Sequence, residues 1–183
     1  MSMTEKKITY FEQAGDENTD RVLDLVSKKA EKAGVSNIVL ASTTGQTARV
    51  AAERFEGQDV RLTVVPHQFG FGKSNKFPDE LVDELEDAGH RVHWGTMLFH
   101  TEGLYRNSTP TALAEMLRCF CQGIKVCFEI SFMAADAGHV EQGERIIAVA
   151  GTGAGADTAI YATAATTQDV SDFNVNHILC MPE

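Results

Sequence analysis

The chain has 183 residues, of which 43% are hydrophobic and 23% are charged, and this composition excludes a wholly disordered protein. Its length fits a single domain, residues 1–183, that buries its own core. Acidic residues outnumber basic ones by 26 to 16, and the net charge of −10 argues against a nucleic-acid or membrane-surface partner. With four cysteines, a polar first segment and no run of eighteen apolar residues, we expect a cytoplasmic protein.

The first half of the chain alternates apolar runs with helical patterns. Short apolar runs predict strands at 8–11, 38–41 and 62–65. Apolar residues at helical spacing predict one helix from the capping residues 16–19 to Gly34, and a second that ends near Gly57.

The second half continues the alternation less regularly. We expect helices at 78–89, 109–123 and 132–137, a loop at 96–107, and strands at 91–94, 126–130, 146–150, 158–162 and 178–181. The segment between the last two strands is too short for a regular crossover helix, so this pair is antiparallel or irregular. The sequence predicts an α/β fold: a three-layer, doubly wound, mostly parallel sheet.

In an open α/β sheet, ligands bind beyond the carboxyl ends of the strands. This rule nominates the loops 42–47, 66–76, 95–107, 131–138 and 151–157. The first is chemically the richest, because Ser42, Thr43, Thr44 and Thr47 supply four hydroxyls around Gly45 at a helix start. Free amide groups and the helix dipole favour a phosphate or another anion there. The alternative is simple helix capping, which needs only one hydroxyl.

Two glycine-rich segments look like nucleotide-binding motifs, but the surrounding sequence does not fit either motif. The Gly-Lys-Ser at 72–74 lacks the first P-loop glycine, since His67 stands in its place, and no helix starts at Ser74. Lys73 is then an anion contact or a solvated lysine. The run Gly151-Thr152-Gly153-Ala154-Gly155-Ala156 resembles a dinucleotide fingerprint, but a strand follows it where a helix is required. It is either a turn that wraps a ligand or a tight turn between strands.

Isolated polar residues give weaker indications. Glu129 stands in an apolar run, where an unpaired carboxylate is costly, so it either pairs structurally or points into the site. Asp136 lies further along the chain, and it either belongs to the site or is a surface residue of the short helix. His67, directly after a strand, is the best placed of six histidines. We expect no metal site, because no third ligand clusters with His90 and His93.

The run Ile38-Val39-Leu40-Ala41-Ser42-Thr43-Thr44-Gly45-Gln46-Thr47-Ala48 resembles the C-terminal domain of pyruvate kinase, in which this turn holds a phosphate of a sugar-phosphate activator. Gln46 replaces the usual basic residue, which argues against a sugar bisphosphate. The turn 151–154 resembles that family's glycine-rich effector loop. The whole chain is similar to stand-alone proteins of this type, through residues 11–19, 41–48, 126–138, 151–159 and 180–182.

The resemblance implies a pyruvate kinase C-terminal domain-like fold and an association with flavin mononucleotide (FMN). It implies no phosphotransfer, because the catalytic barrel of pyruvate kinase is a separate unit of about 250 residues. A homo-oligomer is expected. The predicted ligand-binding residues are Ser42, Thr43, Thr44, Gly45, Gln46, Thr47, His67, Phe69, Gly70, Glu129, Met133, Asp136, Gly151 and Thr152.

Three functions remain open on the sequence. The first is a binding protein for a phosphorylated ligand, with FMN as the leading candidate. The second is an FMN-dependent oxidoreductase of unknown substrate, in which the flavin does the chemistry. The third is a regulatory module that senses a sugar phosphate. No catalytic residue can be assigned from the sequence.

Overall fold

The computed structural model describes residues 3–72 and 77–183. Within this part of the chain, seven strands form one sheet in the order β1-β7-β6-β5-β2-β3-β4. The strands are β1 (Thr9–Phe11), β2 (Asn37–Ala41), β3 (Arg61–Val65), β4 (Arg91–Val92), β5 (Arg145–Ala150), β6 (Thr158–Thr163) and β7 (Asn174–Pro182).

The sheet is parallel through its centre and mixed toward one edge. β5, β2, β3 and β4 run parallel to one another, and β1 runs parallel to β7. β6 is antiparallel to both of its neighbours, β5 and β7. The expected irregularity at the end of the chain is therefore an antiparallel pair, and the mostly parallel α/β prediction is confirmed.

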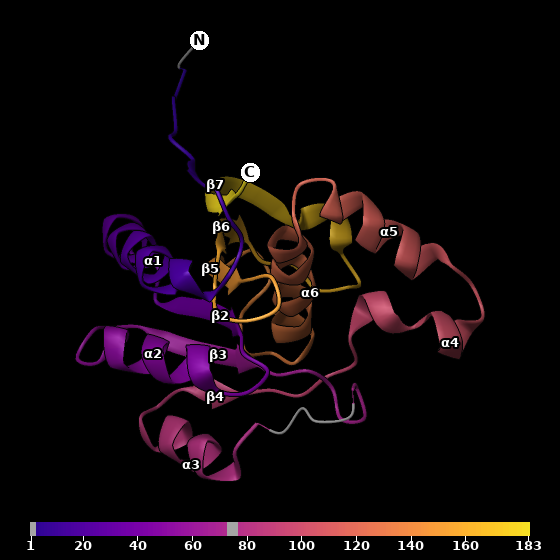
Figure 1. Ribbon diagram of the computed structural model, residues 1–183, viewed down its shortest axis with the longest axis horizontal. Coiled ribbons are helices and arrows are strands. Elements are labelled where there is room, and N and C mark those ends of the chain that lie inside the picture. Colours follow the sequence, from indigo (N-terminus) through magenta and orange to yellow (C-terminus); the bar gives the residue numbers. More distant parts are fainter. Residues whose placement is uncertain (1–2, 73–76) are drawn as a thin grey trace.

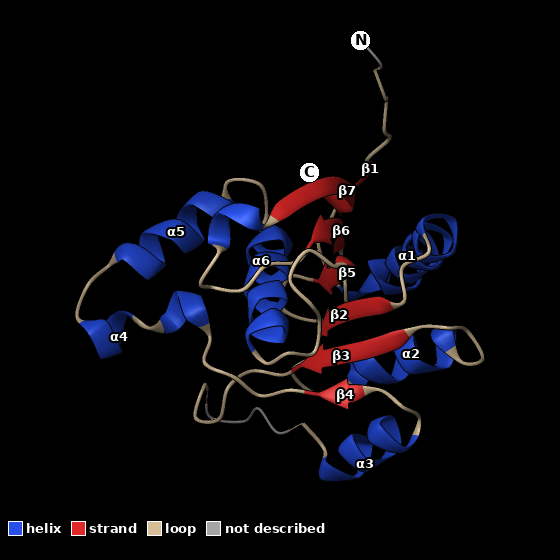
Figure 2. Cartoon of the chain, turned by 180° about the vertical axis from the view of Figure 1, so that it is seen from behind, coloured by secondary structure: helices blue, strands red, loops and turns tan. Residues whose placement is uncertain are grey.

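Helices cover both faces of the sheet, so the molecule has three layers (Figure 1). The helices are α1 (Thr19–Ala33), α2 (Gln46–Phe55), α3 (Asp79–Asp87), α4 (Glu102–Tyr105), α5 (Thr109–Arg118) and α6 (Gln122–Asp136), with short 3-10 turns η1 (Asp16–Asn18), η2 (Leu98–His100) and η3 (Val170–Asp172). α1, α2 and α3 pack on one face, and α6 packs alone on the centre of the other (Figure 2). None of the helices within the described ranges is both long and apolar enough to span a bilayer.

Alternation along β2 builds both cores at once. Ile38 and Leu40 point toward α1 and α2, whereas Val39 points toward α6. Strands that are buried on both faces read as continuous apolar runs, which is why β2, β3 and β5 were recognisable in the sequence.

The predicted strand at 126–130 is wrong, because these residues form the middle of α6. Eleven of the fifteen residues in this helix are buried, from Gly123 to Ala135. A helix that is apolar all round shows no amphipathic period, and a short apolar run within it cannot be distinguished from a buried strand. The loop at 131–138, expected to follow this strand, is consequently the second half of α6 and the turn after it.

The helix predicted at 109–123 is too long: it covers α5, a three-residue turn and the first two residues of α6. α5 ends at Arg118, and Gly123 lies in the first turn of α6 rather than at a helix end. A Cβ atom at Gly123 would lie 2.1 Å from Thr158 Oγ1, so the glycine permits close packing of α6 on β6. The apolar face expected on the helix at 109–123 is largely exposed: Leu113 and Met116 on α5 have exposed fractions of 48% and 68%, and Phe120 in the turn after α5 has 59%.

Candidate functional site

The order in which the chain adds strands to the sheet reverses beside β2. From β2 the chain winds outward through β3 and β4, then returns through α4, α5 and α6 to β5 on the other side of β2. Such a switch point opens a crevice at the carboxyl ends of the strands. Two adjoining cavities, of about 730 and 240 Å³, lie there and share Thr43, Pro66 and His67 in their linings.

The loop after β2 is organised mainly by its own packing. Ser42 Oγ accepts a hydrogen bond from the Ala48 amide at 3.2 Å, as a helix cap does. Gly45 has φ of +87°, and a Cβ atom there would lie 2.4 Å from Leu81 Cδ2 on α3. This glycine is thus explained by backbone conformation and by the approach of α3. Ser42 and Thr47 are buried, and Thr44 and Gln46 are exposed.

Thr43 is the residue of this loop that lines both cavities. It immediately precedes the turn that starts α2, a ten-residue helix whose positive dipole end faces this edge of the sheet. The four-hydroxyl cluster predicted from the sequence is therefore divided: Thr43 reaches the cavities, while Ser42 caps the helix.

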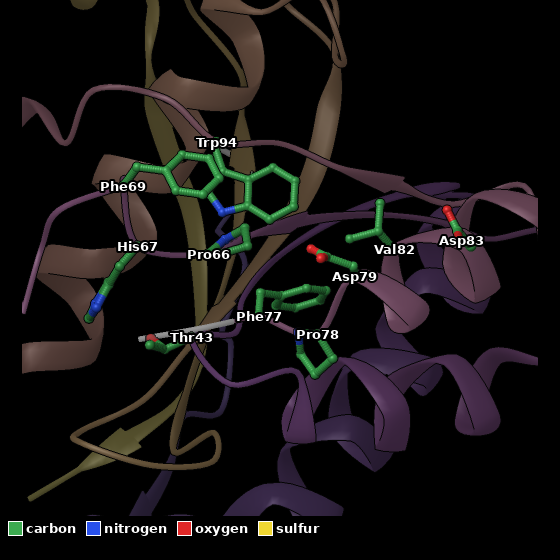
Figure 3. Close-up of a pocket in the computed structure, with 10 residues that line it drawn as sticks. All are labelled: Thr43, Pro66, His67, Phe69, Phe77, Pro78, Asp79, Val82, Asp83 and Trp94. Carbon is green, nitrogen blue, oxygen red and sulfur yellow. The ribbon is translucent and has the colours of Figure 1, made fainter. Parts of the chain in front are cut away.

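The larger cavity has an aromatic wall (Figure 3). The Trp94 and Phe69 rings stack with centroids 5.5 Å apart, and Phe77 meets Trp94 edge-on at 5.9 Å. Thr43 and His67 lie toward one end of the cavity, and Val82 and Asp83 lie toward the other (Figure 3).

The cavity is thus apolar along its side, polar at the Thr43 end and acidic at the other, where Asp79 joins Asp83 in the lining. Gly70 lies in the exposed turn after Phe69 and lines neither cavity. Lys73, considered as an anion contact, lies outside the described residues.

The smaller cavity contains an ion pair. Lys125 and Glu129 lie one turn apart on α6, with Nζ and Oε2 separated by 2.5 Å and both side chains at most 3% exposed. Lys125 Nζ is also 3.1 Å from His100 Nε2, and Glu129 Oε1 accepts a hydrogen bond from the Phe99 amide at 2.9 Å. The pair therefore fastens η2 to α6 at the cavity wall.

The ionisable groups around this pair influence one another. Burial lowers the pKa of His67 and is the largest effect, while the Glu129 carboxylate raises that pKa and Lys125 lowers it. Burial also lowers the pKa of His100, with Lys125 adding to the shift and Glu129 opposing it. Both imidazoles are consequently neutral at pH 7. Burial likewise lowers the pKa of Lys125, and the attraction of Glu129 opposes this shift.

Glu129 was expected either to pair structurally or to point into the site, and it does both. Met133 is buried and lines the same cavity, one turn further along α6. Asp136 is exposed and accepts hydrogen bonds from the backbone amide and the hydroxyl of Thr167, each at 2.8 Å. Asp136 therefore fastens a distant loop and lines neither cavity.

The glycine-rich loop after β5 is occupied by internal contacts. A Cβ atom at Gly155 would lie 2.4 Å from the Cα atom of Asp16, so the loop packs against η1. The buried Asp157 carboxylate accepts from the Thr152 amide at 3.0 Å and from the Gly15 amide at 3.3 Å. Gly151 and Thr152 lie at the same sheet edge as Thr43 but line neither cavity. This geometry favours the tight turn between β5 and β6 over a turn that wraps a ligand.

The sequence did not single out Lys125, His100, Arg118 or Trp94, all of which line a cavity. The spacing of Lys125 and Glu129, four residues apart, is the signal that could have found the pair once the segment is taken as helical. Across the described ranges, no group of three or more His, Cys, Asp or Glu side chains is placed to hold a metal ion.

These features define a class: a doubly wound α/β domain with ligand-sized cavities at the carboxyl edge of its parallel strands. The pyruvate kinase alpha/beta domain family matches residues 20–160, and the chain belongs to that family.

Among solved structures, the chain is similar to Cryptosporidium parvum pyruvate kinase in complex with ADP. The identity is 14% and the TM-score 0.45, over 80% of this chain and 24% of that one. The chain thus spans about a quarter of that enzyme's length.

Proposed function

We propose that this domain is a binding protein for a phosphorylated ligand that carries a planar aromatic ring, with FMN as the first candidate. One observation carries the proposal: a cavity of about 730 Å³ has an aromatic wall and ends at Thr43, beside the start of α2. Its volume is typical of small-molecule sites, which are mostly apolar with a few convergent polar groups.

Different parts of the larger cavity fit the phosphate, the sugar and the ring of such a ligand. A phosphate fits the Thr43 end, where the positive end of the α2 dipole and a hydroxyl favour negative charge. Asp79 and Asp83 repel a phosphate at the other end, and their carboxylates can accept hydrogen bonds from sugar hydroxyls. A flat ring packs on Trp94 and Phe77.

A bound flavin would supply electron transfer, while the protein would supply binding, orientation and electrostatics. His67 lies between the two cavities, neutral at pH 7, and can exchange a proton with a ring that rests beside it. An FMN-dependent oxidoreductase is therefore the second candidate function. A sugar-phosphate sensor is the third, and it makes no use of the aromatic wall.

The chain's single tryptophan, Trp94, makes the test site-specific. We expect purified protein to show a flavin absorption band, or to show saturable quenching of Trp94 fluorescence when apoprotein is titrated with FMN. Thr43→Glu should weaken binding at least tenfold, because it places a negative charge beside the phosphate. Thr4→Glu adds the same charge on an exposed segment away from the cavity and serves as the control.

A titration with riboflavin, which lacks the phosphate, tests whether the phosphate contributes to binding. Equal affinity for riboflavin and FMN, or unchanged affinity in Thr43→Glu, rules out the phosphate assignment. A protein that stays colourless and unquenched with FMN, but is stabilised by sugar phosphates, favours the sensor instead.

We also propose that the domain works in the cytoplasm as a homo-oligomer. All four cysteines are free thiols, which suits a reducing compartment. Apolar side chains on α4, on α5 and in the turn after α5 are largely exposed, and surfaces of this kind commonly mark protein–protein contacts. They are Leu104, Tyr105, Leu113, Met116 and Phe120.

A further inference from the structure

The smaller cavity differs in chemistry from the larger one. One side of it carries charge, with Arg118 at the end of α5 and the Lys125–Glu129 pair on α6. Most of the remainder is apolar, formed by side chains from β2, β3, α6 and the loops that follow the strands, and the polar residues Thr43, His67, His100 and Gln122 complete the lining. These apolar residues are Ala41, Val65, Pro66, Phe71, Met97, Val126, Ile130 and Met133.

Among the residues that the structure describes, the charged side chains of the lining sum to one positive charge. Arg118 and Lys125 contribute two positive charges and Glu129 one negative charge. His67 and His100 are neutral at pH 7 because burial lowers the pKa of each. Arg118 also forms an ion pair with Glu115, an exposed residue of α5 outside the lining, so its charge is balanced on the solvent side and not within the cavity.

The cavity volume limits the size of any occupant. About 240 Å³ equals the volume of roughly eight water molecules in the liquid. A ligand of roughly eight non-hydrogen atoms can therefore enter, which is far smaller than a nucleotide. The lining that it shares with the larger cavity, at Thr43, Pro66 and His67, provides the way in.

We propose that this cavity binds a small monocarboxylate with a short apolar body, as a site separate from that of the phosphorylated ligand. The carboxylate lies against Arg118 and Lys125, and the apolar body packs on Val126, Ile130 and Met133. Guanidinium groups match carboxylates in geometry as well as charge.

A phosphate dianion fits the same cavity poorly. Lys125 already pairs with Glu129 and Arg118 with Glu115, so the described part of the lining holds no further cation for a second negative charge, and the Glu129 carboxylate would repel it. An uncharged ligand fits less well, since it cannot accept a charge-assisted hydrogen bond as an anion from the guanidinium of Arg118 or the ammonium of Lys125. A ligand with a single negative charge and an apolar body can contact the cations on one side of the cavity and the apolar side chains on the other.

The test compares isovalerate with isovaleramide, which has the same shape and no charge, at constant ionic strength. Calorimetric titration of the apoprotein should give one site for isovalerate and at least tenfold weaker binding of the amide. Inorganic phosphate should not displace isovalerate. Equal binding of acid and amide overturns the proposal, as does displacement by phosphate, and so does the absence of any binding.

Two variants locate the site. Arg118→Gln removes the half-exposed guanidinium and should weaken isovalerate binding by roughly ten- to a hundredfold, the usual cost of a charge-assisted hydrogen bond. Arg49→Gln removes an arginine from an exposed ion pair with Glu84 and is the matched control, with unchanged affinity expected. Unchanged affinity in Arg118→Gln overturns the proposal.

Val126→Phe gives an independent check, because it fills the cavity and keeps every charge. It should abolish isovalerate binding and leave FMN quenching of Trp94 intact. The proposal does not rest on FMN, since the titrations use apoprotein. Failure of FMN to bind with isovalerate binding preserved refutes the proposed function alone, and the reverse outcome refutes only the carboxylate site.

Discussion

Removing the lysine of the buried ion pair should destabilise the fold strongly. In Lys125→Met, the 2.5 Å contact to Glu129 and the 3.1 Å contact to His100 are lost. Glu129, which is 2% exposed, then keeps only the Phe99 amide as a hydrogen-bond donor among the contacts described above. Breaking a buried pair on one side costs about 3–5 kcal/mol, because it leaves an uncompensated charge away from water.

This loss is a large part of the stability of the domain, which for a typical protein is about 5–15 kcal/mol. At about 2–4 °C per kcal/mol for a chain of this size, the melting temperature should fall by roughly 6–20 °C. The double variant Lys125→Met/Glu129→Gln removes both charges, so it should recover most of the loss.

Urea denaturation followed by far-ultraviolet circular dichroism measures all members of this double-mutant cycle. The matched control is Arg49→Met, which breaks an exposed ion pair with Glu84 and should cost at most about 1 kcal/mol. If Lys125→Met costs no more than this control, or if the double variant costs the sum of the two single ones, the pair is not coupled as the structure indicates.

Three further predictions follow from other features. All six histidines have a pKa lowered mainly by burial, so the unfolded chain binds more protons than the folded one just below pH 6.5. The free energy of unfolding, measured with urea, should therefore fall as the pH drops from 7.5 to 5.5. A free energy of unfolding that does not change with pH would contradict this prediction. Gly45→Ala should lower the melting temperature more than Gly34→Ala does. Both glycines have positive φ, but only at Gly45 would the added Cβ atom lie 2.4 Å from a neighbour, Leu81 Cδ2. Equal losses would refute the packing argument. Met116→Glu/Phe120→Glu should lower the sedimentation mass of an oligomer, whereas an unchanged mass would remove α5 from the interface.

The central strands could be predicted because each is buried on both faces and bounded by turn residues. Burial on both sides turns β2, β3 and β5 into unbroken apolar runs, and glycines end the helices between them. α6 could not be recognised, because the same two-sided burial makes a helix look like a strand when only five residues are compared. The error moved Glu129 from the inside of a helix to the end of a strand.

The site was predictable at the level of the sheet edge and not at the level of side chains. The rule for open α/β sheets selected the loops after β2 and β3, and Thr43, His67 and Phe69 line the cavities found there. The rule does not reveal which hydroxyl of a loop caps its own helix, as Ser42 does. Nor does it reveal the approach of α3 to Gly45, a contact between segments distant in sequence.

The buried ion pair has a bearing on function that goes beyond stability. Replacing a buried pair with apolar residues of similar volume is often neutral or stabilising, so stability alone gives no reason for Lys125 and Glu129 to occupy this position. Both residues line a cavity wall, and through His100 and the Phe99 amide they fix the position of η2 beside that cavity. The cost of burying the two charges is therefore understandable if their hydrogen bonds are needed to hold η2 at the cavity wall. An apolar pair could make neither the contact to His100 nor the hydrogen bond from the Phe99 amide.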